Sequence, residues 1–504
     1  MPSASGISRR RMLQLMAGAA AASPLAAVIG RTQSAPPRQA PNVLMFLTDD
    51  QRFDGLSAAG NKILKTPNID RIASGGIRFA EAFCTNALCA PSRATLLTGL
   101  YSHVHGVITN GDSPAMRNQP GLRDDQITFV RLLKQAGYRT SLVGKWHIRS
   151  QPAGFDDWAI LPGQGVYVDP DVLVNGTRLT FRGHADDIVG DQALAILRSR
   201  PRNQPFCLLC HFKSPHRSWI PASRFEHAFD DVEIPEPATF NDTLEGRPNA
   251  VRQHDMAIAT MPDFRERGVP ESLPLEERKR RNFQAMVKNI DRTLLSVDEN
   301  VGRVLDYLDK EGLAENTIVF YGSDNGFFHG EHGLFDKRLM YEPSIRVAML
   351  LRFPARIKPG RVDTTHMVLN TDIAPTILEL CGLPVPIWMQ GRSGVPLLDR
   401  ADAPWRDAFL YEYFEYPAVH CIRKNRGVRT DRWKLIQYWE QPEEWELYDL
   451  KSDPDEVRNL ADRAEYAGQK RSLQALLERL RREVGSVDPP GPAPLAAPCR
   501  PDRG

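Results

Sequence analysis

The stretch PNVLMFLTDDQ, residues 41–51, is a continuous apolar run that ends in two aspartates. A run without polar alternation is typical of a strand that is buried on both faces of a parallel sheet. The same pattern recurs three times, and each run ends in polar residues: YRTSLVGKWH (138–147), QPFCLLCHFKSPH (204–216) and NTIVFYGSDNG (316–326). The sequence therefore predicts four buried strands with charged or polar residues at their carboxyl ends.

Helical patterns separate these strands. We expect helices over residues 66–76, with Thr66 as the cap before Pro67, and over three further stretches: 127–137, 186–199 and 281–312. Strands that alternate with helices of this length indicate an α/β fold with a mostly parallel sheet covered on both faces. Ligands of such sheets bind at the carboxyl ends of the strands, where all four polar clusters fall.

The chain of 504 residues is longer than one ordinary domain. We expect a catalytic domain over 41–395, followed by a smaller domain over 396–485 in which aromatic, strand-like segments form an antiparallel sheet and one amphipathic helix follows. Residues 486–504 form a Pro-rich tail. Residues 217–275 lack periodicity and are predicted to be a long insertion at the rim of the site, either for substrate selection or as a surface excursion.

The N-terminal segment, residues 1–35, has consecutive arginines followed by a short Ala-rich apolar run. Ser8, Arg9, Arg10 and Leu13 fit a twin-arginine export signal, which predicts transport of the folded protein by the twin-arginine machinery to the periplasm or beyond. A basic N-terminal extension without a targeting role is the alternative. No later segment is apolar and long enough to span a bilayer, so stable membrane insertion is not expected.

Charge and cysteine content exclude other classes of protein. The 64 basic and 62 acidic residues leave a net charge of +2 and no basic field for a nucleic acid. Seven scattered cysteines do not form a disulfide scaffold. Cys207 and Cys210 lie in a predicted buried strand and are interpreted as core residues, with a metal or redox role as the weaker alternative. Cys84 could pair with Cys89 in an oxidising compartment.

The acidic strand ends are candidate metal ligands. Two strands end in three carboxylates and one amide carbonyl, and oxygen ligands of this kind suit Ca²⁺ or Mg²⁺ better than zinc. Each pair alone is also common in ordinary turns. The candidate ligands are Asp49, Asp50, Asp324 and Asn325.

A second set of residues suits an anion. The segment CAPSRATLLTGLY, residues 89–101, is predicted to begin a helix, where backbone N–H groups and the positive end of the helix dipole attract anions. Arg93 adds a guanidinium, and further cations or proton donors follow the strands and a later loop: Lys145, His147, His216 and Lys337. Together with the metal ligands they predict a metal-assisted hydrolase of a phosphate or sulfate ester, with Cys89 near the reacting atom.

The segment CAPSRATLLTG, residues 89–99, resembles the signature C-x-P-S-R-x-x-x-L-x-G of the type I sulfatases. The likeness extends over almost the whole mature chain and includes PNVLMFLTDDQ, GKWH, SPH, SDNG and, near the end, WELYDLKSDPDEVRNLA. The resemblance implies an alkaline-phosphatase-like fold. It also implies that Cys89 is a precursor, which a formylglycine-generating enzyme oxidises to formylglycine, an aldehyde that hydrates to a diol.

The resemblance also assigns roles to the remaining residues. Residue 89 as formylglycine completes a calcium site with Asp49, Asp50, Asp324 and Asn325. One hydroxyl of the diol attacks sulfur, His216 and Lys337 protonate the leaving alcohol, and His147 takes the proton of the other hydroxyl so that sulfate is expelled. In this scheme the remaining residues, Arg93 and Lys145, bind the sulfate group.

Within this family the middle of the chain is similar to carbohydrate sulfatases near N-acetylglucosamine-6-sulfatase. We therefore expect removal of sulfate from a sulfated carbohydrate, 6-O-sulfated N-acetylglucosamine above others. Ala348 replaces a proline that is usual in the family, and we expect only a small local change there. The alternatives are a phosphonate monoester or phosphodiester hydrolase of the same superfamily and an inactive binder of sulfated glycans.

Overall fold

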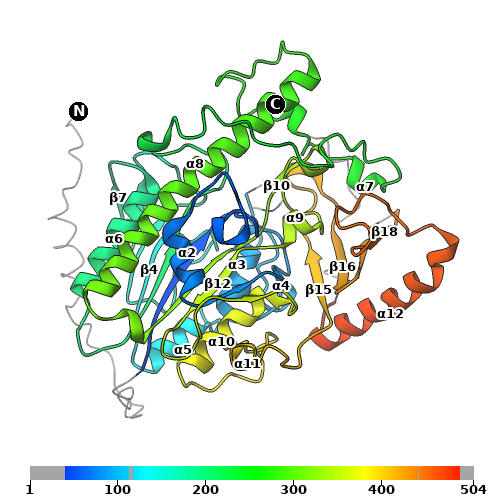
Figure 1. The fold of residues 1–504 in the computed structure, drawn as a ribbon. Helices are drawn as coiled ribbons and strands as arrows, with labels where there is room; N and C mark the ends of the chain where they lie inside the picture. Colours follow the sequence, from blue (N-terminus) through cyan, green and yellow to red (C-terminus); the bar gives the residue numbers. More distant parts are fainter. Residues whose placement is uncertain (1–39, 113–115, 117, 441, 488–504) are drawn as a thin grey trace.

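The computed structural model describes residues 40–112, 116, 118–440 and 442–487 (Figure 1). The predicted export signal and nearly all of the predicted tail lie outside the described residues. Within the described part of the chain, no helix is both long and apolar enough to cross a membrane.

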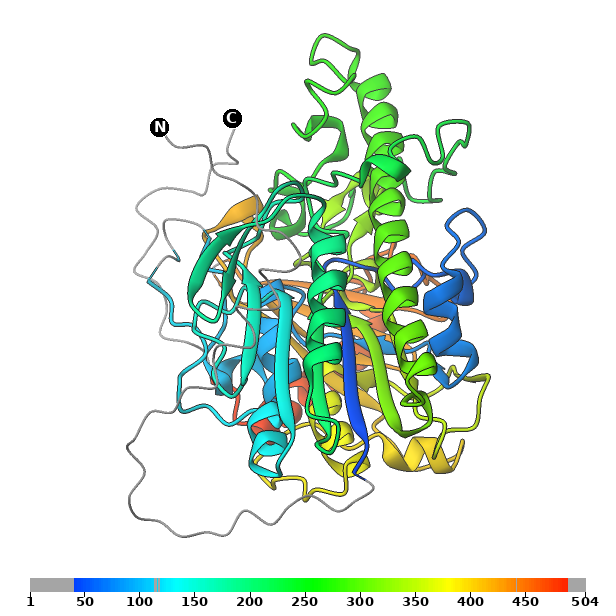
Figure 2. The ribbon, with the colours of Figure 1, turned by 90° about the vertical axis from the view of Figure 1, so that its left-hand side faces the viewer.

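A ten-stranded sheet forms the centre of the molecule (Figure 2). Its five middle strands are parallel, and antiparallel pairings occur only toward the two sides. The order across the sheet is β13 (Arg361–Asp363), β2 (Ile77–Phe79), β12 (Met349–Arg352), β9 (Thr317–Ser323), β1 (Asn42–Thr48), β8 (Phe206–His211), β4 (Arg139–Lys145), β5 (Asp157–Leu161), β6 (Asp171–Val174) and β7 (Thr177–Thr180). The four strands predicted from the sequence are the adjacent strands β9, β1, β8 and β4.

Both faces of β1 are buried because helices cover the sheet on both sides. Leu44 and Phe46 belong to one hydrophobic cluster, whereas Val43, Met45 and Leu47 belong to the other. The first cluster contains α2 (Pro67–Ser74), α6 (Ala185–Ser199) and α8 (Leu275–Lys310), of which α6 and α8 lie side by side in front of the sheet in Figure 2. The second contains α3 (Cys89–Thr98), α5 (Phe129–Gln135) and α10 (Ile373–Leu380). The predicted α/β fold is confirmed.

Thr66 is the residue before α2, as predicted, but its side chain does not cap the helix. Its hydroxyl donates to Asp70 Oδ1 over 3.1 Å. The backbone N–H groups of Asn68 and Ile69 instead donate to Asp298 Oδ1 of α8, over 3.0 and 2.8 Å. A carboxylate from a helix distant in sequence therefore satisfies the first turn of α2, which no local pattern could reveal.

The C-terminal part forms a separate four-stranded antiparallel sheet of β15 (Ala408–Tyr413), β16 (Asn425–Thr430), β17 (Trp433–Tyr438) and β18 (Glu444–Asp449). One face of β15 adds Phe409, Tyr411 and Tyr413 to the main core. On the other face, Leu410 packs in one cluster with Leu473 of α12 (Ala467–Val484), the outermost helix at the lower right of Figure 1. The expected sheet and helix are present, and the domain boundaries at 395 and 485 remain predictions.

The remaining elements are short. Two strand pairs are β10 (Phe328–His329) with β11 (Phe335–Asp336) and β3 (Ala82–Phe83) with β14 (Val368–Leu369). The short α-helices are α4 (Ser102–His105), α7 (Asn249–Arg252), α9 (Glu342–Ile345) and α11 (Val395–Asp399). The 3₁₀ turns are η2 (Ser57–Ala59), η4 (Ser223–Phe225), η5 (Ile258–Thr260), η6 (Ala314–Asn316), η7 (Glu331–Gly333), η8 (Asn370–Asp372), η9 (Val419–Cys421) and η10 (Ala464–Tyr466). Of the predicted insertion 217–275, all but its last residue, Leu275, which begins α8, forms only short helices between loops; the segment lies in the upper part of Figure 1.

Candidate active site

The acidic residues after β1 and β9 meet because these strands are parallel neighbours. Asp49 and Asp50 follow β1, and Asp324 and Asn325 follow β9. The Asp50 N–H donates to Asp324 Oδ1 over 3.2 Å, and Asn325 Nδ2 donates to Asp50 Oδ1 over 2.7 Å. The backbone of Asp50 is left-handed, with φ of 70°, which turns the chain sharply at the end of the strand.

This arrangement fits a divalent cation. Asp49, Asp50 and Asp324 are buried, and each has a carboxylate oxygen within 4.8 Å of the others. Burial, together with the charges of Asp49 and Asp324, raises the pKa of Asp50 to about 7, against the opposing effect of Lys337. The Oδ1 atom of Asn325 is buried and has no hydrogen-bond partner among the described residues. Crowded carboxylates and an orphaned amide oxygen are the donor set that Ca²⁺ prefers.

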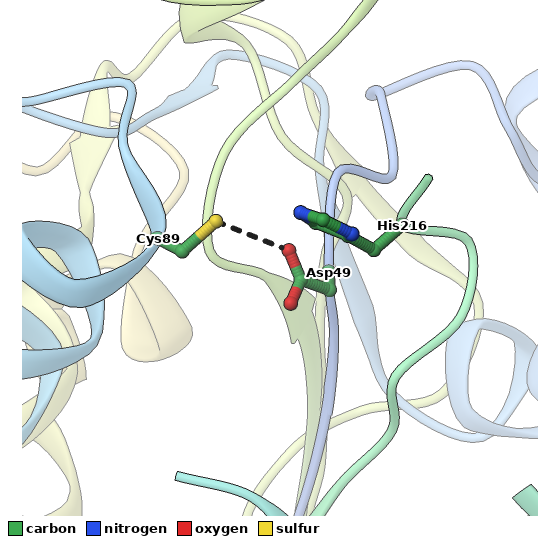
Figure 3. A group of neighbouring side chains, drawn as sticks. All are labelled: Asp49, Cys89 and His216. Atoms are coloured by element: carbon green, nitrogen blue, oxygen red, sulfur yellow. Dashed lines mark hydrogen bonds between the residues drawn. The ribbon is translucent and has the colours of Figure 1, made fainter. Parts of the chain in front are cut away.

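Cys89 is the first residue of α3 and faces this acidic group. Its Sγ donates to Asp49 Oδ1 over 3.4 Å, and Figure 3 shows Cys89 and His216 on opposite sides of the Asp49 carboxylate. Burial and the charge of Asp49 raise the pKa of the Cys89 thiol well above its ordinary value. The thiol is therefore protonated at neutral pH and is a poor nucleophile.

Arg93 lies one turn further along α3 and is completely buried. Its guanidinium donates to Asp324 Oδ2 over 2.8 Å, to Asp49 Oδ2 over 3.2 Å and to the Lys145 carbonyl over 2.8 Å. It thus links the end of α3 to the ends of three strands, and it neutralises part of the acidic charge.

Two lysines contribute further positive charge. Lys337, in the loop after β11, donates to both oxygens of Asp50 over 2.5 and 2.7 Å. Lys145, the last residue of β4, pairs with Asp49 Oδ2 and donates to Gln164 Oε1 over 2.5 Å. Each lysine therefore forms an ion pair with one carboxylate of the candidate metal site.

The two predicted histidines have different surroundings. His216 Nε2 lies 3.9 Å from Asp50 Oδ2, and its Nδ1 is 2.6 Å from the Arg217 carbonyl. His147 Nε2 lies 3.4 Å from Asp112 Oδ1. Burial, then Lys145, lowers the pKa of both rings, that of His147 to about 4, so both are neutral at pH 7.

The structure brings together nearly all of the predicted site residues. Cys89, Arg93, Lys145, His216 and Lys337 each contact or face one of the three carboxylates, and Asn325 contacts Asp50, whereas His147 is held beside Asp112. Sequence reasoning missed Asp112 and Gln164, which come from connections without a strand-end pattern.

Several side chains outside this cluster have structural roles. Cys84, Cys207 and Cys210 are buried free thiols, so Cys84 does not pair with Cys89. Glu331 and His332, in the loop before Lys337, pair with Arg52 and Asp242 and so hold neighbouring loops together.

Comparison with known proteins decides the family. A family model described as Sulfatase matches residues 41–383, which is more than half of the chain. The chain belongs to the sulfatase family. A second model, described as N-sulphoglucosamine sulphohydrolase, C-terminal, matches residues 330–483 of this sulfatase. The protein is therefore a sulfuric ester hydrolase, as the sequence predicted.

Two relatives of this sulfatase are named for, or were solved with, a sulfated amino sugar. It is 39% identical to an N-acetylglucosamine-6-O-sulfatase of Bacteroides thetaiotaomicron over 497 residues, covering 89% of this chain and 88% of the relative. A solved structure of a protein in complex with its substrate D-glucosamine-2-N,6-O-disulfate matches with a TM-score of 0.81 and 38% identity, covering 88% of this chain and 98% of the other.

The sulfatase also shares its fold with a phosphonate monoester hydrolase of Agrobacterium radiobacter. The TM-score is 0.69 at 22% identity, covering 88% of this chain and 96% of the other. This likeness concerns the fold alone. The predicted alkaline-phosphatase-like architecture is confirmed.

Proposed function

We propose that this sulfatase removes the 6-O-sulfate from glucosamine residues of a sulfated carbohydrate, with 6-O-sulfated N-acetylglucosamine as the preferred unit. The observation that carries the proposal is the 39% identity, over nearly the full chain, to an N-acetylglucosamine-6-O-sulfatase. The solved relative bound to a 6-O-sulfated glucosamine supports the same substrate class.

In this proposal Ca²⁺ is held by Asp49, Asp50, Asp324 and Asn325, together with residue 89. The ion, when bound, neutralises the buried carboxylates and the charge of the sulfate group. Lys145 and Lys337, which pair with Asp49 and Asp50 in the structure, are then free to contact the sulfate oxygens.

Residue 89 acts as formylglycine, which a formylglycine-generating enzyme makes from Cys89 and whose hydrated aldehyde supplies the nucleophile. The raised pKa of the Cys89 thiol supports this role, because an unmodified thiol is protonated here. Pro91 and Arg93 belong to the segment that the maturation enzyme reads.

The chain's own residues bind the anion and move protons. Arg93 and Lys145 neutralise the sulfate oxygens. Protonation of the departing alcohol oxygen is assigned to Lys337 and His216, on either side of Asp50: Lys337 is the cation at pH 7, and His216 contributes in its protonated form. His147 accepts a proton as sulfate leaves, and its neutral state at pH 7 suits a base.

We further propose export through the twin-arginine pathway, directed by the segment at residues 1–35. This route transports folded protein, so Cys89 can be oxidised in the cytoplasm before export. Blocking the pathway is expected to leave protein with an aldehyde at residue 89 inside the cell. Finding only the thiol there contradicts cytoplasmic maturation.

The substrate is tested by sulfate release after co-expression with a formylglycine-generating enzyme. The panel contains N-acetylglucosamine-6-sulfate, N-sulfated glucosamine, a 2-sulfated uronic acid, choline sulfate and an aryl phosphonate monoester. Turnover of the 6-sulfated amino sugar above the others is expected. Preference for the phosphonate shows the alternative hydrolase activity, and no turnover of any substrate with aldehyde present, together with tight glycan binding, indicates an inactive binder.

A further inference from the structure

The two ring nitrogens of His147 have unequal environments. Nε2 lies 3.4 Å from Asp112 Oδ1, whereas Nδ1 is buried and has no hydrogen-bond partner among the described residues. The backbone of His147 is left-handed, with φ of 55°, a conformation that a non-glycine residue keeps only where the surroundings impose it. The left-handed backbone fixes where the His147 side chain leaves the chain, and the ring nitrogens differ in their contacts.

We propose that Asp112 is the positioning residue that fixes the tautomer of His147. The proposal rests on the proposed role of His147 as a proton acceptor. A carboxylate oxygen only accepts hydrogen bonds, so the ring proton resides on Nε2 and the Nδ1 lone pair is left bare. Nδ1 is then the base.

A second contact holds Asp112 in place. Gln164 Nε2 donates to Asp112 Oδ2 over 2.8 Å, and Gln164 Oε1 accepts from Lys145 Nζ over 2.5 Å. Lys145 in turn pairs with Asp49. A chain of polar contacts thus runs from the proposed base to the acidic cluster, and each oxygen of Asp112 has its own donor.

The charged groups that act on His147 are consistent with this assignment. Lys145 opposes protonation of the ring, while Asp112 and Asp49 favour it. When Nδ1 accepts the proton of the remaining hydroxyl of residue 89, an N–H bond forms, the electron pair of the O–H bond becomes the new C=O bond, and the C–O bond to sulfate breaks, so that sulfate leaves with that electron pair. Asp112 then faces the positive ring and stabilises it, as the carboxylate does in a Ser-His-Asp triad.

The first test compares Asp112→Asn with the wild-type enzyme, both matured. The asparagine side chain has the same shape and can donate as well as accept, so the tautomer is no longer fixed. The expected result is a decrease in kcat of about 10²-fold, the usual contribution of a positioned base, with KM changed less than about threefold. The acidic limb of the kcat profile against pH also shifts, since the positive ring loses its partner.

The second test measures the protonation of the two ring nitrogens of His147 directly and does not require an active enzyme. Nitrogen NMR of protein that contains ¹⁵N-labelled histidine and the unmodified Cys89 is recorded at pH 7, with His147 assigned from His147→Gln. The wild type is expected to carry the proton on Nε2, and Asp112→Asn is expected to shift the population toward Nδ1. Because this readout does not depend on turnover, it separates failure of the proposal from failure of the proposed function.

Asp125→Asn is the matched control. Asp125 lies in the same connection, pairs with Arg123 and is 81% exposed in its side chain, so tautomer and kcat should both stay at wild-type values. Gln164→Leu is the second variant; it removes the support of Asp112 and should change both readouts in the same direction, with kcat lower by about tenfold. A proton on Nδ1 in the wild type, or a variant in which only one readout changes, overturns the proposal.

Discussion

Two charge clusters of this sulfatase each contain three carboxylates and three cations, yet they differ in how the charges are arranged. The strand-end cluster consists of Asp49, Asp50, Asp324, Arg93, Lys145 and Lys337. The subdomain clamp consists of Glu81, Glu342, Glu456, Arg346, Arg429 and Lys434, and it joins the C-terminal sheet to the main body.

In the clamp, cations separate the carboxylates. Arg429 lies between Glu81 and Glu342, at 2.9 and 3.3 Å, and Lys434 lies between Glu342 and Glu456, at 2.9 and 2.6 Å. Despite burial, Arg429 and Lys434 hold the pKa of Glu342 well below its ordinary value. Each carboxylate of the clamp therefore has a cation partner, while burial and the charge of Glu342 raise the pKa of Glu456.

In the strand-end cluster the carboxylates crowd one another, and burial together with the charges of Asp49 and Asp324 raises the pKa of Asp50. Asn325 Oδ1 has no hydrogen-bond partner among the described residues. Clamp residues also line a cavity of about 820 Å³, so neither cavity size nor number of charges distinguishes a reactive site. The crowding of three carboxylates within 4.8 Å of one another does, among the described residues. Buried atoms that lack a hydrogen-bond partner in the described part of the chain do not, because the clamp also has them, at Glu342 Oε1 and at the Nε atoms of Arg346 and Arg429.

The largest effect is expected for Cys89→Ala. It removes the precursor of the proposed nucleophile, and we expect sulfate release to fall by at least about 10⁴-fold. The matched control is Cys210→Ala, which changes a buried thiol in β8 outside the cluster. Residual activity within tenfold of wild type in Cys89→Ala contradicts the proposed chemistry.

Lys434→Met should break the clamp. It leaves Glu342 and Glu456 buried without their shared cation, which is expected to reduce the free energy of unfolding by about 3–5 kcal/mol. Specific activity of the folded fraction should stay at the wild-type level. Denaturant titration measures the loss, and Lys470→Met, which alters a pair with the exposed Asp462, serves as control. An unchanged midpoint in Lys434→Met shows that the clamp carries no stability.

Calcium is expected to stabilise the wild type by about 2.7 kcal/mol at a hundredfold excess over its Kd, since it binds only the folded state. Asp324→Asn should abolish this shift of the melting temperature, because one ligand is lost. Glu342→Gln, the equivalent change in the clamp, should lower the melting temperature but keep the calcium shift. If calcium raises the melting temperature of both variants by the same amount, the proposed difference between the two clusters is wrong.

Calcium affinity should also depend on pH. Without a cation the pKa of Asp50 is raised to about 7, so Asp50 is protonated below pH 7 and calcium binding displaces that proton. Calcium affinity should therefore rise about tenfold per pH unit up to about pH 7 and then level off. In the cation-free protein the folded state holds more protons than the unfolded state above pH 4, so this group destabilises the fold as pH rises toward 7. Calorimetric titration at pH 6 and 7 measures the affinities, and equal values disprove the coupling.

The smallest effect is expected on the exposed face of α8. Glu277 pairs with Arg281 one turn later over 2.6 Å, with both side chains about half exposed. Glu277→Gln should change the free energy of unfolding by less than about 0.5 kcal/mol, because water screens the pair. If Glu277→Gln reduces the free energy of unfolding as much as Lys434→Met does, burial of the clamp is not the reason for its stabilising effect.

Much of the architecture could be predicted because it depends on local patterns. Apolar runs predicted β1, β4, β8 and β9, since a strand covered on both faces has no polar alternation. The location of Asp49, Asp50, Asp324 and Asn325 at one edge followed from parallel pairing alone. Residue 89 was identified from a short motif that requires no structural context.

Other features could not be predicted from sequence. The cap of α2 comes from Asp298, which is 230 residues from Asn68 in the chain. Asp112 and Gln164 lie in connections whose composition resembles that of any turn, and only packing places them beside His147 and Lys145.

The sequence by itself thus determined four buried strands, the helices between them, the residue types at the ends of those strands and the family. Only the tertiary structure decided which carboxylates crowd together, which are separated by cations and which nitrogen of His147 is left bare. The physical reason is that hydrophobic periodicity and motifs are properties of neighbouring residues, whereas pKa values and hydrogen-bond partners depend on distances of a few ångströms between segments far apart in the chain.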